Sequence, residues 1–256
     1  MEYGVCVGPK LAAMAAGLGY DFFETQVMDL LRPLDDEAAF QAASAATRAA
    51  PIPCKVLNCF LPGTLKTTGP DVDPARLDAF AASVCRRAGD VGVDVIVFGS
   101  GGSRSVPDGF DRAEAWRQVA GFCRRLGPIA APHRITFVIE PLSVAYCNFL
   151  NTVGECADLV REVNHPAIRL LVDSHHWGKD NDSADDIVSS GPLLAHVHVA
   201  TPKSRLAPGG EPYDFKPFFD ALKAGGYDGR VSIESDLPNP PDDLRRALDV
   251  MRALAE

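Results

Sequence analysis

Eight short apolar runs alternate with helix-like segments along the whole chain, and this alternation restricts the fold more than any other feature. Each run is rich in β-branched or aromatic residues, as buried strands are. The runs cover residues 3–7, 20–26, 54–60, 93–98, 136–140, 169–173, 195–198 and 231–234. Helical patterns, several opened by Asp, Ser or Pro, cover residues 9–18, 35–49, 74–90, 111–129, 152–163, 183–190, 215–225 and 242–255.

Strands that alternate with helices form parallel sheets, and eight such alternations match the number in a closed barrel. The chain has 256 residues, close to the roughly 250 that one barrel of this kind needs. No linker, sustained internal repeat or low-complexity tract interrupts the pattern. We therefore predict an α/β fold, a (β/α)8 TIM barrel, with a single domain over residues 1–256.

The composition of the chain argues against several classes of binding partner. A net charge of −9 argues against a nucleic-acid-binding surface, which depends on many contacts from Lys and Arg to phosphate. No window approaches the roughly 18 to 20 apolar residues of a membrane span, and the N-terminus lacks an export signal. Seven cysteines without a Cys-x-x-Cys pair indicate reduced, mostly buried thiols. We expect a cytoplasmic enzyme with a small-molecule substrate and with no nucleic-acid or membrane partner.

Four of the apolar runs end in an acidic residue or a histidine: Glu140, Asp173, His198 and Glu234. In an α/β barrel, the C-terminal ends of all strands open onto the face that carries the active site, so these side chains should converge. One acidic residue after a strand is most often a surface charge. Four at buried strand ends are costly unless they are paired or bind a metal. We predict that these four residues bind one divalent cation.

Carboxylates with one imidazole favour a hard divalent cation, and no thiolate stands at these positions. Mn²⁺ is the first choice, with Co²⁺, Mg²⁺ and Zn²⁺ as alternatives. We place the imidazoles of His196 and His198 on opposite faces of their strand, so that His198 alone enters the barrel mouth and His196 is a buried core histidine. Glu24, which lies near the end of the second run, either supports the site or forms an ordinary salt bridge.

Longer motifs surround these residues. They are Ile139-Glu-Pro-Leu142 with Asn148-Phe-Leu-Asn-Thr152, Asp173-x-x-His176, His196-Val-His198, Arg205 before a Pro-Gly loop, Gly225-Gly-Tyr-Asp-Gly229 and Ser232-Ile-Glu234. Over most of the chain they resemble the xylose isomerase-like TIM-barrel superfamily. The resemblance is strongest to its sugar isomerases and epimerases, a branch that includes D-tagatose/D-psicose 3-epimerases and hydroxypyruvate isomerases.

The resemblance implies roles for individual residues. The four strand-end residues match the metal ligands of the family. His176 matches a histidine that contacts a substrate oxygen, and Arg205 matches an arginine near the substrate. The resemblance also implies a sugar or keto-sugar substrate. Relatives form dimers or tetramers, so a homo-oligomer is one option, but no exposed apolar face can be identified from the sequence and the oligomeric state stays open. In the ketose epimerases a second, substrate-binding glutamate follows the first metal glutamate by six residues, and here that position is Tyr146.

These roles predict a divalent-metal-dependent sugar isomerase or epimerase. A cation that chelates a hydroxy-carbonyl compound acidifies the neighbouring C–H and stabilises the resulting enediolate. Glu140 and Glu234 would then act as the catalytic pair, one removing the proton and the other returning it.

Two other readings stay open. The first is a metal-dependent lyase or dehydratase of the same fold, acting by keto-inositol dehydration or 3-keto-glycoside cleavage, which Tyr146 makes more credible. The second is a non-catalytic barrel that binds a sugar or a partner protein. A histidine-rich trinuclear zinc endonuclease of this fold class is disfavoured, because the chain has six histidines and an acidic balance.

Overall fold

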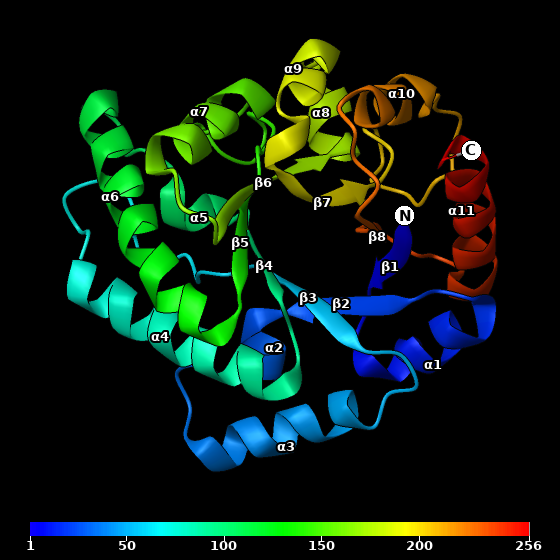
Figure 1. The fold of residues 1–256 in the computed structure, drawn as a ribbon, viewed down its shortest axis with the longest axis horizontal. Coiled ribbons are helices and arrows are strands. Elements are labelled where there is room, and N and C mark those ends of the chain that lie inside the picture. The colour runs from blue at the N-terminus through cyan, green and yellow to red at the C-terminus, as the bar shows by residue number, and fades with distance from the viewer. Residues whose placement is uncertain (256) are drawn as a thin grey trace.

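The structure, a computed structural model, describes residues 1–255 as a closed barrel of eight parallel strands with helices around it (Figure 1). The strands pair in chain order, and β8 closes the barrel on β1. They are β1 (Glu2–Cys6), β2 (Phe22–Gln26), β3 (Cys54–Asn58), β4 (Val95–Phe98), β5 (Thr136–Ile139), β6 (Ile168–Asp173), β7 (Leu194–Val199) and β8 (Arg230–Ile233). The predicted (β/α)8 barrel is confirmed.

Eight of the helices correspond to the predicted ones. They are α1 (Pro9–Leu18), α3 (Glu37–Arg48), α4 (Pro74–Val91), α6 (Arg112–Ala130), α7 (Val153–Val163), α9 (Ala184–Ser189), α10 (Lys216–Ala224) and α11 (Pro240–Ala255). Three further helices follow strand ends directly or after two residues: α2 (Val27–Leu31), α5 (Gly101–Arg104) and α8 (Ser174–Asp180). Two 3-10 turns cover Ala131–His133 and Gly191–Leu193. The three unpredicted helices thus belong to the loops at the C-terminal mouth of the barrel.

Short-range capping explains why the main helices begin where the sequence predicts. The side chains of Asp36, Asp73 and Asp111 each accept a hydrogen bond from a backbone N–H in the first turn of the helix that follows. Thr152 and Glu155 form a reciprocal capping box at the start of α7. These caps fix the lengths of the loops between the strands and the helices.

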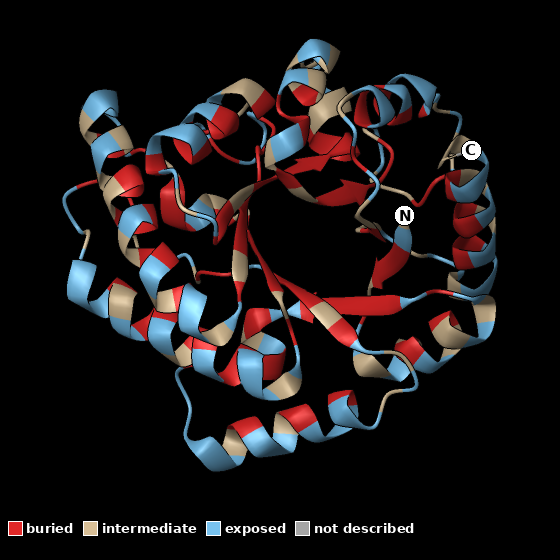
Figure 2. Cartoon of the chain, viewed as in Figure 1, coloured by how far each residue is buried: buried red, intermediate tan, exposed pale blue. Residues whose placement is uncertain are grey.

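The strands are mostly buried, and the surrounding helices have buried and exposed residues (Figure 2). Strands that are covered on both faces read as continuous apolar runs rather than alternating ones. A large cluster lies between the barrel and its helices. A smaller cluster is built from alternate residues of several strands: Phe22, Val56, Val95, Val97, Val138 and Leu171. The four acidic and histidine side chains therefore stand at the open end of a filled barrel.

Arg104, at the end of α5, links the ends of β4 and β5 through hydrogen bonds. It is fully buried, and its guanidinium donates hydrogen bonds to the carbonyl oxygens of Phe98 (3.0 Å), Glu140 (2.5 Å) and Leu150 (3.2 Å). A buried charge is tolerated when polar groups surround it in this way. Arg104 thus holds the backbone of Glu140 in place from the side of β4.

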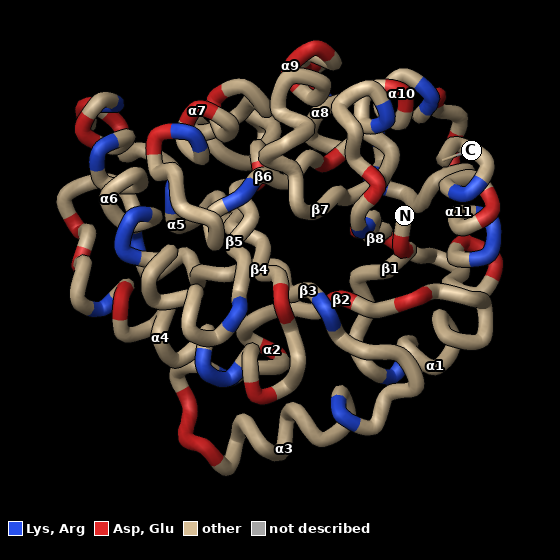
Figure 3. The backbone as a smooth tube through the Cα atoms, in the orientation of Figure 1, with Lys and Arg blue, Asp and Glu red and all other residues tan. Residues whose placement is uncertain are grey.

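Charges of both signs are interspersed along the outer helices (Figure 3). Among residues 1–255, no helix combines the length and the apolar character that crossing a membrane would require. All seven cysteines are free thiols, and five of them are buried, as expected for reduced core residues.

Candidate metal centre

The structure brings the four predicted ligands together at the C-terminal mouth of the barrel. Glu140 directly follows β5, Asp173 ends β6, His198 lies in β7 and Glu234 directly follows β8. One candidate donor atom from each residue lies within 4.8 Å of the other three. His198 Nδ1 is 3.4 Å from Glu140 Oε1 and 3.3 Å from Glu234 Oε2.

The donor atoms fit a divalent cation. Glu140 Oε1, Asp173 Oδ2 and His198 Nδ1 are buried, and none of them has a hydrogen-bond partner of good geometry among residues 1–255. Leaving buried polar atoms unsatisfied costs about 1–3 kcal/mol each. A single cation bound between these side chains would satisfy all three at once. Three carboxylates and one imidazole are donors that Mn²⁺ and similar ions accept.

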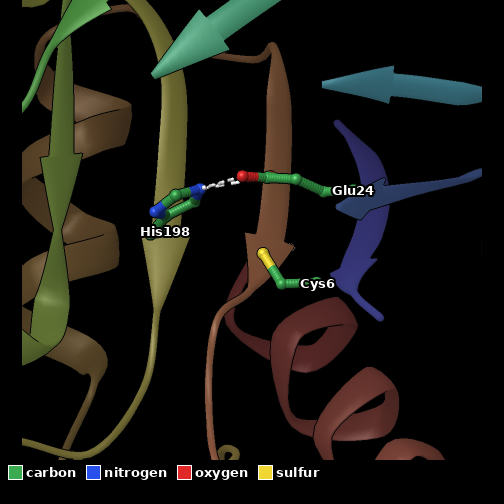
Figure 4. Close-up of side chains that lie close together, drawn as sticks. All are labelled: Cys6, Glu24 and His198. Carbon is green, nitrogen blue, oxygen red and sulfur yellow. Dashed lines mark hydrogen bonds and ion pairs between the residues drawn. The ribbon is translucent and has the colours of Figure 1, made fainter. Parts of the chain in front are cut away.

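Glu24 of β2 orients His198. Its carboxylate accepts a hydrogen bond from His198 Nε2 at 3.1 Å (Figure 4) and another from His196 Nε2 at 3.2 Å. With the Nε2 proton directed at Glu24, the other ring nitrogen, Nδ1, points toward Glu140 and Glu234. Carboxylates that accept the outer N–H of a metal-binding histidine fix its tautomer and orientation. Glu24 therefore pairs with two buried histidines of β7 and is placed to support the candidate site.

The charge around His198 also favours a cation. Burial lowers the pKa of His198, but the carboxylates of Glu24 and Glu234 outweigh it and hold the pKa well above the usual value. The carboxylates around His198 thus stabilise positive charge in this part of the cluster.

Cys6, Glu24 and His198 form a second group of donor atoms within 4.8 Å (Figure 4). The carboxylate and the imidazole in this group already hydrogen-bond to each other. Burial, and next the charge of Glu24, hold the pKa of the Cys6 thiol well above its ordinary value, so the thiol keeps its proton. We interpret this group as a hydrogen-bonded support for His198, with Cys6 as a further donor to Glu24.

The placement of His196 and His198 on opposite faces of β7 was wrong. Residues two positions apart in a strand point to the same face. Both rings contact Glu24 inside the barrel, with their centroids 4.9 Å apart. His196 is the buried histidine that we expected, and it lies deeper in the barrel beside Phe22.

Replacing Glu24 with glutamine should weaken metal binding more than folding. The glutamine amide has only one acceptor oxygen, whereas two imidazole N–H groups, from His196 and His198, need an acceptor. Its NH₂ group would face one of these N–H donors. We expect Glu24→Gln to lower the affinity for Mn²⁺ about 10- to 100-fold, as is typical when a partner of a metal-binding histidine is lost. Calorimetric titration of the metal-free protein measures this. Glu2→Gln, at the exposed start of β1, is the matched control, and an unchanged affinity in Glu24→Gln would contradict the bracing role.

The two candidate catalytic glutamates have opposite electrostatic surroundings. Burial raises the pKa of Glu140 above its usual value. Burial acts in the same direction on Glu234, but positive charge at His198 and Arg205 outweighs it and lowers the pKa of Glu234. Arg205 Nη2 donates to Glu234 Oε2 at 2.6 Å, and Asn58 Nδ2 lies 3.3 Å from Glu234 Oε1.

The two predicted substrate residues line one cavity with the metal centre. This cavity, of about 330 Å³, is bordered by His176, Arg205 and Tyr146 as well as by the two glutamates. His176 Nδ1 accepts a hydrogen bond from the Ser143 backbone N–H at 3.2 Å, which leaves the proton on Nε2. The Tyr146 hydroxyl lies 3.0 Å from His175 Nε2, and the Arg205 guanidinium lies 6.0 Å from the centre of the Tyr146 ring. Tyr146 thus forms a wall of the cavity.

The backbone of Arg205 is strained. Its φ of 51° lies in the left-handed region, which costs a non-glycine residue about 1–3 kcal/mol. Hydrogen bonds to Thr201 O (3.1 Å) and from Asp236 N (2.8 Å) hold this conformation, so the loop after β7 is tied to the end of β8. The guanidinium is thereby fixed over Glu234.

Sequence reasoning missed two residues of the site. Asn58 ends β3, where it was hidden inside an apolar run, and it contacts Glu234. Gly99, after β4, lies so close to Glu140 that a Cβ atom at this position would stand 1.6 Å from Glu140 Oε2. The glycine-rich segment was visible in the sequence, but only the geometry shows that Gly99 makes room for the carboxylate of Glu140, a candidate ligand.

Comparison with known proteins finds one matching family model and several similar sugar epimerases. The family model described as xylose isomerase-like TIM barrel matches residues 12–254. The L-ribulose 3-epimerase of Methylomonas sp. (strain DH-1) is 28% identical over 246 residues, which cover 88% of this chain and 77% of that protein. The 3-dehydro-D-guloside 4-epimerase of Escherichia coli (strain K12) is 28% identical, over 46% of this chain and 45% of that protein.

Among solved structures, a D-psicose 3-epimerase from Clostridium cellulolyticum H10 with D-tagatose superimposes with a TM-score of 0.85. The match covers 100% of both chains at 19% sequence identity. At this level of identity, the likeness shows a shared fold.

Proposed function

The chain belongs to the xylose isomerase-like TIM-barrel family, and on that premise we propose that it is a divalent-metal-dependent sugar epimerase or isomerase. Its substrate would be a keto-sugar or a related hydroxy-carbonyl compound. The observation that carries the proposal is the pair Glu140 and Glu234, each within 3.4 Å of His198 Nδ1 at the edge of one cavity. The curated relatives named above are sugar epimerases, which supports the same chemistry.

Glu140, Asp173, His198 and Glu234 would hold the cation, with Mn²⁺ as the first choice and Co²⁺, Mg²⁺ or Zn²⁺ as alternatives. When bound, the cation supplies Lewis acidity that acidifies the C–H next to a carbonyl group.

The two glutamates would transfer the proton. Each turns one oxygen toward His198. The second oxygen of Glu234, Oε1, accepts one hydrogen bond from Asn58 Nδ2 at 3.3 Å and keeps a further lone pair for the substrate. Glu140 Oε2 faces Gly99, which also lines the cavity. A pair of carboxyl groups whose pKa values are pushed apart suits one base and one acid. Glu234, with the lowered pKa, would take up the substrate proton. Glu140, in its protonated form, would deliver its own proton to the opposite face for epimerisation or to the adjacent carbon for isomerisation, and exchange with solvent would then restore both groups.

His176 and Arg205 would position the substrate. His176 Nε2–H is a donor for a substrate oxygen, because Nδ1 is already an acceptor for Ser143. The N–H groups of Arg205 that do not contact Glu234 can hold a distal hydroxyl or carboxylate. Both side chains act as fixed donors at the edge of the metal centre.

Elimination is the second candidate function, and Tyr146 favours it. A tyrosine stands where the ketose epimerases carry a substrate-binding glutamate, and its hydroxyl is a potential proton donor beside the cavity. The same metal centre could then dehydrate a keto-inositol or cleave a 3-keto-glycoside.

Turnover in deuterated water distinguishes these reactions. The Mn²⁺-loaded protein is incubated with keto-sugars, keto-inositols and 3-keto-glycosides, and the products are followed by NMR. Epimerisation or isomerisation yields an isomer with solvent deuterium at the reacting carbon, whereas elimination yields a product of different composition. A protein that takes up no divalent metal and converts none of these compounds would overturn the proposal in favour of a non-catalytic barrel.

A further inference from the structure

Two cavities meet at the candidate metal centre, and of the proposed catalytic and substrate-binding residues only Glu234 and Arg205 line the second. The first, of about 330 Å³, contains Glu140 and His176. The second, of about 360 Å³, lies beside the ends of β1, β2 and β8. Asn58, Arg205 and Glu234 line both cavities. The Arg205–Glu234 ion pair therefore forms the boundary between two adjoining spaces.

The second cavity has the polar lining that a sugar needs. Hydroxyl, amide and carboxylate groups border it, from Thr25, Gln26, Asp29, Ser235 and Asp236. A sugar hydroxyl both donates and accepts hydrogen bonds, so mixed groups of this kind can satisfy it. Two buried atoms on its border, Ser235 Oγ and Asn58 Oδ1, have no hydrogen-bond partner among residues 1–255. Asn58 is only 6% exposed, so a ligand would satisfy an atom that is otherwise costly to bury.

The first cavity has a different character. Leu61, Leu142 and Tyr146 line it beside the two glutamates. Each cavity alone reaches the lower end of the range for a complete small-molecule site, about 300–1,000 Å³. A single sugar ring beside Glu140 would thus leave the second cavity without an occupant.

From this geometry we infer that the substrate is a keto-disaccharide or similar keto-glycoside, with the keto ring in the first cavity and a second sugar residue in the second. The inference rests on the proposed function, because the position of Glu140 and Glu234 decides which cavity holds the reacting ring. Asn58 and Arg205, which border both cavities, would face the glycosidic linkage.

Gly8 offers a way to fill the second cavity alone. It lines this cavity, its φ of −71° and ψ of 164° suit any residue, and a Cβ atom there meets nothing within 4 Å. Residues that precede a proline also prefer the extended conformation, and Gly8 precedes Pro9. Gly8→Phe should therefore occupy the second cavity. Gly17→Phe is the matched control, since Gly17 is exposed on α1 and a Cβ there also meets nothing within 4 Å.

The test uses two substrates that differ only by the second sugar, 3-keto-cellobiose and 3-keto-D-glucose, with the Mn²⁺-loaded protein. We expect a kcat/KM for the disaccharide at least about tenfold higher, equivalent to roughly 1.4 kcal/mol. Gly8→Phe should abolish this preference while changing kcat/KM for 3-keto-D-glucose less than about threefold, and Gly17→Phe should keep the preference. Equal use of both sugars by the unmodified protein, or an equal loss of both in Gly8→Phe, would overturn the inference.

Calorimetric binding of cellobiose and D-glucose separates this inference from the proposed function, because it requires no turnover. We expect cellobiose to bind more tightly than D-glucose, and we expect Gly8→Phe to lose this difference and Gly17→Phe to retain it. This result supports the second sugar site even if no keto-sugar is converted. Equal affinity for both sugars refutes the site even if a free ketose is epimerised. Gln26→Ala gives a second check, because it should weaken the binding of cellobiose and leave the binding of D-glucose unchanged.

Discussion

Replacing either Glu140 or Glu234 with glutamine will reduce kcat by about 10²- to 10⁴-fold while the barrel stays folded. Glutamine keeps the size of the side chain but can neither take up nor return a proton. Both positions should be affected, because one residue takes up the substrate proton and the other donates a proton to the product. The measurement is the initial rate at saturating Mn²⁺ on the best substrate, with the thermal unfolding temperature as the measure of folding.

The two variants should differ in detail. Glu234→Gln also removes the carboxylate that Arg205 contacts at 2.6 Å, so KM should rise together with the loss of kcat. Glu162→Gln is the matched control, since Glu162 contacts Trp116 and Arg124 on the outer helices. Near-normal turnover in both Glu140→Gln and Glu234→Gln would refute the assignment of the catalytic pair.

Replacing Gly99 with alanine will abolish most activity at little cost in stability. The added Cβ would stand 1.6 Å from Glu140 Oε2, so the carboxylate must move. Its end is flexible and can turn aside, which limits the change in unfolding free energy to about 1 kcal/mol. A displacement of about 1 Å at a catalytic group is enough to lower turnover about 100-fold. Metal affinity should fall as well, because Glu140 is a candidate ligand.

Gly63→Ala is the control for this substitution. A Cβ at Gly63 meets its nearest atom at 3.7 Å, an ordinary contact, so rate and stability should both stay near normal. Equilibrium urea unfolding and steady-state kinetics measure the two effects separately. If Gly99→Ala retained full turnover, Glu140 Oε2 could not be held where the structure places it.

The barrel could be predicted because each of its elements has a local signal. Buried parallel strands read as apolar runs, and caps such as Asp73 and Thr152 mark the starts of helices. The helices α2, α5 and α8 could not be predicted in this way. Each is short and follows a strand end directly or after two residues, so neither a helical period nor a separate loop marks where it begins.

The candidate site could be predicted in part for a related reason. Parallel strands deliver their end residues to one face, so chain order alone brings Glu140, Asp173, His198 and Glu234 together. Glu24 contacts His198, which lies 174 positions further along the chain, because β2 faces β7 across the barrel. No local sequence pattern encodes this contact. The close approach of Gly99 to Glu140 depends in the same way on the packing of β4 against β5.

The origin of the ligands separates the chain into two parts with different tasks. All four candidate ligands lie on β5 to β8, whereas β1 to β4 and the segments that follow them supply Gly8, Gln26 and much of the cavity walls. The candidate ligands are thus encoded in the second half of the coding sequence, whereas most of the lining of the second cavity is encoded in the first half. Substitutions before β5 that spare Glu24 and Gly99 would reshape the cavity walls without replacing a candidate ligand, so the accepted sugar would change while the proposed reaction is inherited unchanged.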